Sequence, residues 1–61
     1  MYATFIFRIP VQGHGYAKVV EYQIRTTSEG KARTKALGFA NRLAQNGVIV
    51  GTPILVGVIE G

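Results

Sequence analysis

The chain has 61 residues, with seven Lys or Arg against three Glu, no Asp and no Cys. This length allows one small domain, residues 1–61, and the missing cysteines exclude disulfides and thiolate metal sites. Hydrophobic residues at 48% and charged residues at 16% are typical of a globular chain, and the net charge of +4 favours an anionic partner or serves solubility.

The first two predicted elements are strands. Residues 2–11 alternate, with Phe5, Phe7, Ile9 and Val11 on one side. A glycine-rich stretch at 12–15 follows, and residues 16–26 alternate again. Two alternating runs joined by a short glycine loop predict an antiparallel hairpin.

A helix over residues 28–46 comes next. Thr26 or Ser28 is the expected N-cap, and Asn46-Gly47 is typical of a helix end. Between these ends, small and apolar side chains share one side of the helical wheel and predict its packing face: Ala32, Ala36, Phe39, Ala40 and Leu43. Gly38 falls on the opposite side.

The last element, residues 48–60, is a strand that is apolar on both faces and broken near 51–53. The sequence therefore predicts a small ββαβ domain of the α+β class, with a three-stranded, mainly antiparallel sheet and one helix on one face. The third strand can pair with the first (order 2-1-3) or with the second (order 1-2-3). We favour 2-1-3, because it centres the most hydrophobic strand of the hairpin.

The third strand would then lie at an edge of the sheet, where an apolar strand invites pairing with another chain. A domain of this size usually needs additional stabilisation by a disulfide, a metal or a partner subunit, and self-association is the option that this composition leaves. We expect a homodimer or a larger ring. The predicted interface combines the uncovered sheet face with the third strand: Tyr2, Ile6, Val19, Ile54, Val56 and Val58.

Cationic side chains suggest a second kind of partner. Lys31, Lys35 and Arg42 fall within about 40° of one another on the helical wheel, away from the alanine face. Arg8, Lys18 and Arg25 of the hairpin could extend this charge. Such a stripe would suit a phosphate backbone, although a solvated helix face commonly carries the same residues.

No catalytic constellation is visible. The Gly13-His14-Gly15 loop lacks the last glycine of a kinase-type phosphate loop, because Lys18 stands at that position. His14 has no acid or nucleophile near it in sequence, and Ser28 is explained as a cap. We therefore expect no enzyme activity, no cofactor and no metal.

The functional hypothesis is a small non-enzymatic binding and assembly module that self-associates and binds a protein partner, as an inhibitor, adaptor or accessory subunit. Its size is also typical of phage and mobile-element proteins. The alternative is a small basic nucleic-acid-binding protein. No signal peptide is visible, and the uncharged stretch 47–59 is too short to span a bilayer as a helix, so we expect a cytoplasmic protein without a membrane partner.

Overall fold

The N-terminal half of the chain forms the predicted hairpin. In the computed structural model, which describes residues 1–61, β1 (Ala3–Gly13) pairs antiparallel with β2 (Tyr16–Thr26) along its whole length. Phe5, Phe7, Ile9 and Val11 point to one face and are buried there. Their partners on β2 share that face because opposite residues of an antiparallel pair project to the same side.

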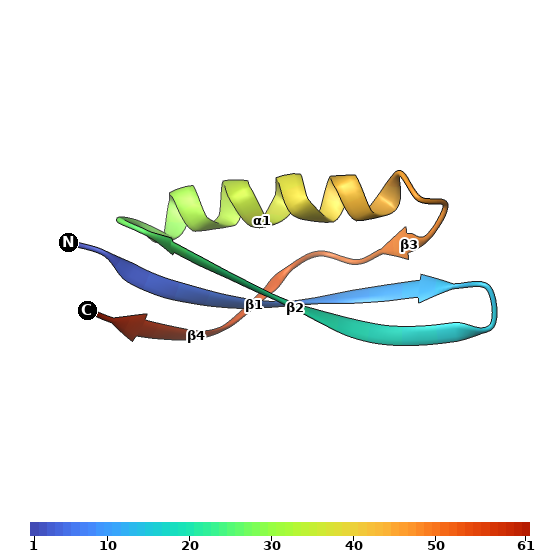
Figure 1. The fold of residues 1–61 in the computed structure, drawn as a ribbon, viewed down its shortest axis with the longest axis horizontal. Helices are drawn as coiled ribbons and strands as arrows, with labels where there is room; N and C mark the ends of the chain where they lie inside the picture. The colour runs from blue at the N-terminus through green and yellow to red at the C-terminus, as the bar shows by residue number, and fades with distance from the viewer.

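The helix α1 (Glu29–Ala44) lies over this apolar face (Figure 1). Ser28 is its N-cap, and the Ser28 hydroxyl accepts a hydrogen bond from the Lys31 N–H at 3.3 Å. After the helix, Gly47 adopts a φ of +79°, which glycine reaches without steric cost. Three alanines of α1 are buried against the sheet: Ala32, Ala36 and Ala40. Their small side chains allow the helix to lie close to the large residues of β1.

The C-terminal segment completes the sheet on the other side of β1. It forms β3 (Ile49–Val50) and β4 (Ile54–Glu60), both antiparallel to β1. The order 2-1-3 and the single helix on one face are thus confirmed, but the sheet has four strands instead of three. Val56 is the extra residue of a bulge, because Ile6 pairs with Gly57 while Phe7 pairs with Leu55.

The interruption between β3 and β4 lies opposite Pro10, in the stretch 51–53 where the sequence predicts a break. The Gly51 N–H donates to the Pro10 carbonyl at 2.8 Å, so the backbone of Pro10 faces the C-terminal segment. Proline has no N–H with which to continue that ladder, and the pairing stops between β3 and β4. A Cβ on Gly51 would lie 2.7 Å from the Pro10 ring, so the close approach also requires glycine.

The sheet twists strongly along its length (Figure 1). Where β2 leads into α1, β2 lies next to the helix and β4 lies far from it; at the other end β3 lies next to the helix. Accordingly, α1 lies against β1, β2 and β3, and no Cα of β4 comes within 8 Å of it. The helix therefore covers only part of the sheet.

The helix can be stabilised at one glycine where there is room for a side chain. Gly38 lies in the middle of α1, and a Cβ there would meet no atom within 4 Å. We expect Gly38→Ala to raise the free energy of unfolding by about 0.5–1 kcal/mol, because alanine loses less backbone entropy in a helix. Urea denaturation followed by circular dichroism would measure it. Gly47→Ala, at positive φ, should lower stability instead; an unchanged midpoint for Gly38→Ala would contradict the prediction.

Candidate interaction surfaces

The groups capable of acid–base or nucleophilic chemistry are dispersed. His14 lies in the hairpin turn and Ser28 caps the helix. The Glu21 carboxylate accepts a hydrogen bond from Gln23 at 2.7 Å, and the Glu29 carboxylate pairs with Arg33 at 2.9 Å. No three His, Asp, Glu or Cys side chains lie together as metal ligands would. The candidate sites described below are the uncovered faces and edges of the sheet and the cationic side of the helix.

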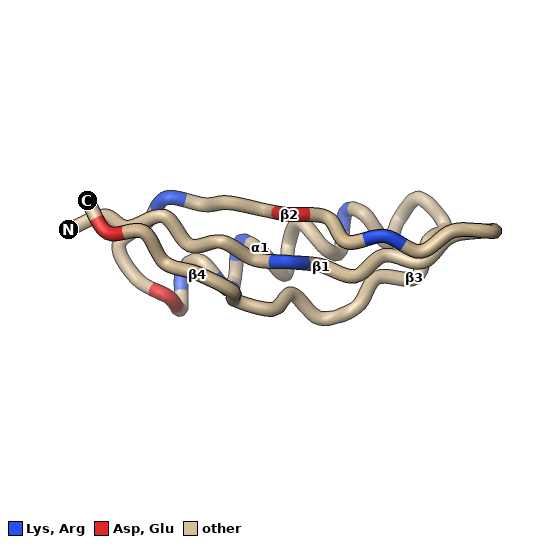
Figure 2. The backbone as a smooth tube through the Cα atoms, turned by 90° about the horizontal axis from the view of Figure 1, so that it is seen from below, with Lys and Arg blue, Asp and Glu red and all other residues tan.

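The face of the sheet away from α1, here called the open face, carries no covering layer (Figure 2). The strand registers place a mixture of apolar and polar side chains on it: Thr4, Ile6, Arg8, Pro10, Gln12, Ala17, Val19, Glu21, Gln23, Arg25, Ile49, Ile54 and Ile59. Val19, Ile49, Ile54 and Ile59 are more than half exposed there. An antiparallel sheet can leave one face in contact with water, but polar side chains then normally make up most of that face.

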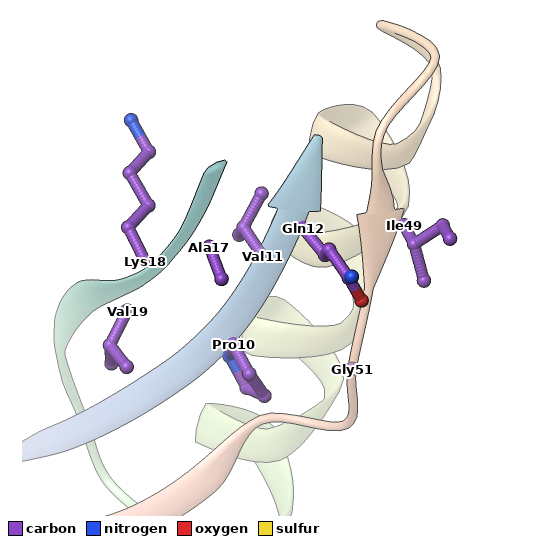
Figure 3. A pocket seen from close by; sticks show the side chains of 8 residues that line it. All are labelled: Pro10, Val11, Gln12, Ala17, Lys18, Val19, Ile49 and Gly51. Carbon is purple, nitrogen blue, oxygen red and sulfur yellow. The ribbon is translucent and has the colours of Figure 1, made fainter. Parts of the chain in front are cut away.

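One end of the open face is hollowed (Figure 3). Pro10, Gln12, Ala17, Val19 and Ile49 line this open hollow, and the backbone of Gly51 closes one side of it. Its lining is mainly apolar and holds no acidic side chain. Lys18 and Val11 complete its lining.

The free edge of β4 is the second uncovered surface. β4 pairs with β1 on one side only, and the chain has no charged residue between Arg42 and Glu60. Val56 and Val58 are about half exposed. Val58 lies opposite Phe5 and so shares the helix-side face, yet α1 does not reach it.

The six residues predicted as an interface thus belong to two surfaces. Ile6, Val19 and Ile54 lie on the open face, and Tyr2 adjoins it, because the Arg25 guanidinium sits 5.6 Å above the Tyr2 ring. Val56 and Val58 belong to the β4 edge. The predicted interface left out five other exposed large apolar residues: Met1, Tyr16, Leu37, Ile49 and Ile59. The alternation of the last strand could have shown Ile59, but the exposure of Leu37 depends on where the helix lies.

Cations gather on one flank of α1. The Arg42 guanidinium lies 5.9 Å from the Phe39 ring centre, and Phe39 stacks on Tyr22 of β2 with centroids 4.5 Å apart. The helical spacing places Lys31 and Lys35 on the same flank, here called the cationic flank. None of the three pairs with a carboxylate, since Arg33–Glu29 is the one ion pair of the molecule.

The three hairpin cations do not extend the cationic flank as one footprint. Arg8 and Arg25 point to the open face, on the opposite side of the sheet. Lys18 shares the face of Val20, near the hairpin end, where its ammonium lies 5.7 Å from the Tyr16 ring centre. Tyr2 and Tyr16 thus each carry a cation over an exposed ring.

Together, fold and surfaces define a small α+β domain with a half-covered sheet, an uncharged apolar edge and a cationic helix flank. Comparison with models of known families, with curated proteins and with solved structures gives no significant match to this chain. Its helix is neither long nor apolar enough to cross a membrane.

Proposed function

We propose that this protein is a non-enzymatic binding and assembly module of the cytoplasm, which self-associates and presents its remaining uncovered surface to a protein partner. The observation that carries the proposal is the distribution of apolar side chains. Seven form the buried core, three of them alanines, whereas ten large ones are exposed. Ten exposed large apolar side chains, several of them adjacent on the open face and on the β4 edge, are typical of a subunit.

The energetics of a small domain support the same proposal. A chain of about 60 residues buries only about 60% of its unfolded surface and has a thin stability margin. With no cysteine and no cluster of metal ligands, a second subunit is the remaining way to stabilise so small a domain. Burial of the open face or the β4 edge would supply the apolar contact that the alanine face of α1 does not.

Light scattering coupled to size exclusion, over a series of protein concentrations, tests this function. We expect the average mass to rise above 6.6 kDa towards an integral multiple as concentration rises. The melting temperature should rise with it, because association stabilises only the folded chain. A monodisperse monomer at high micromolar concentration, with a constant melting temperature, would contradict the proposal.

A second candidate function is nucleic-acid binding through the cationic flank. The specific observation is that Lys31, Lys35 and Arg42 share one flank and have no carboxylate partner. Unpaired cations in a row can neutralise successive phosphates and release their counterions. Affinity that falls steeply with salt distinguishes this candidate from protein binding.

A further inference from the structure

We infer that two copies of this chain associate through the free edges of β4, antiparallel, about a two-fold axis beside Val58, to form one continuous sheet. This inference rests on the proposed self-association and assigns it a place. The strand that pairs with this edge is β4 of the second copy. A row of free backbone groups on an uncharged strand is complementary to the same row on another copy.

Backbone geometry identifies the residues that would pair. The Gly61 N–H donates to the Tyr2 carbonyl at 3.4 Å, so Gly61 directs its polar groups towards the first strand. The direction alternates along an antiparallel strand, and β1 and β4 keep one register from Ala3↔Glu60 to Ile6↔Gly57. Val58 and Glu60 therefore direct their N–H and C=O groups outwards, away from β1. These are the groups that a second strand can bind.

The charge distribution favours this edge over the other one. A protein of net charge +4 repels its own copy wherever cationic surfaces meet. The opposite edge strand, β2, carries Lys18, Glu21 and Arg25, and charged side chains protect sheet edges from pairing. Figure 2 shows β3 and β4 free of charge up to Glu60. Pairing through β4 leaves β2 and the neighbouring cationic flank of each copy on the outside.

The register about Val58 is free of charge conflict. Val58 would lie opposite Val58 of the second copy, and Gly57 opposite Ile59. Glu60 would lie opposite the uncharged Val56, so the two carboxylates stay apart. The bulge at Val56 ends the regular pairing on each side.

The interface is small, which sets the expected affinity. A standard interface removes about 800 Å² from each partner, roughly a fifth of the 4195 Å² surface of this chain. Pairing through one short strand buries less than that. We therefore expect a dimer that is populated at high protein concentration and dissociates on dilution.

The absence of cysteine makes disulfide trapping a clean test. Val58→Cys places one thiol beside the two-fold axis, where a hydrogen-bonded antiparallel pair has Cα atoms about 5.5 Å apart, within disulfide reach. We expect mild oxidation to give a covalent dimer of Val58→Cys in high yield. Val19→Cys is the matched control: its backbone faces outwards on the β2 edge, and its side chain is 61% exposed against 47% for Val58. It should give no covalent dimer, because pairing through β4 keeps the two Val19→Cys thiols apart.

Amide exchange of the unmodified protein provides a second readout, which a folding defect of the variant does not affect. At high concentration, the Val58 amide should exchange at least several-fold more slowly, while the outward amides of Val19 and Gln23 keep their rates. Cross-linking at Val19 without Val58, or a dimer with unchanged Val58 exchange, would overturn the β4 interface and leave self-association intact. A strict monomer would overturn both.

Discussion

Phe7→Ala is expected to remove a large part of the folding free energy of this protein at 25 °C. The Phe7 side chain is fully buried and belongs to the cluster formed with Phe5, Ala32 and Ala36. Removing a buried phenylalanine costs about 3–5 kcal/mol, whereas a chain of 61 residues has a total stability of roughly 3–9 kcal/mol at 0.05–0.15 kcal/mol per residue.

The site has little means of refilling the cavity. The helix presents alanines to Phe7, and a methyl group cannot reach into the space left by a ring. The cost should therefore fall towards the upper part of the range. Urea titration and heat denaturation, followed by circular dichroism, would measure the loss of the folded state.

Ile49→Ala is the control for this prediction. Ile49 is equally apolar but 71% exposed, and we expect its substitution to change the stability by less than about 0.5 kcal/mol at concentrations where the protein is monomeric. A Phe7→Ala protein that unfolds at nearly the wild-type urea concentration would show that Phe7 does not lie at the centre of the core.

Binding to nucleic acid, if the cationic flank serves it, should weaken steeply with salt. Three neutralised phosphates on duplex DNA give a slope of about −2.7 in log affinity against log salt, or roughly a 40-fold loss between about 50 and 200 mM. Fluorescence anisotropy with labelled single- and double-stranded nucleic acid would measure this slope. Replacing Lys31, Lys35 and Arg42 together by glutamine should then abolish binding while leaving the fold intact, because all three are exposed.

A variant of equal net charge separates the flank from general electrostatic attraction. Changing Arg8, Lys18 and Arg25 to glutamine also lowers the formal charge from +4 to +1, but it spares the helix. Binding that survives in this hairpin variant and fails in the helix variant would locate the site on α1. Equal losses of affinity in both variants would indicate attraction by net charge alone. No binding at low salt would contradict nucleic-acid binding and indicate that the positive charge serves solubility.

Local patterns in the sequence determined the elements and the inner face of the sheet. The period-two alternation of Phe5, Phe7 and Ile9 defines which side of β1 is buried, and the alanine spacing of the helix defines its contact face. The Ser28 N-cap and the positive-φ Gly47 shortly after the helix lie where short-range backbone chemistry requires them. The sequence also predicted that Lys31, Lys35 and Arg42 share one side of the helix, because this depends on helical geometry alone.

Long-range packing decided the rest. The sequence predicts the break near 51–53, but only the pairing shows that this break lies opposite Pro10 and that both β3 and β4 pair with β1. The separation of Arg8 and Arg25 from the cationic flank follows from the strand register. Above all, the sheet twist places the helix away from β4, and twist accumulates over the whole sheet rather than at any residue. Which apolar residues remain uncovered is therefore a property of the tertiary structure.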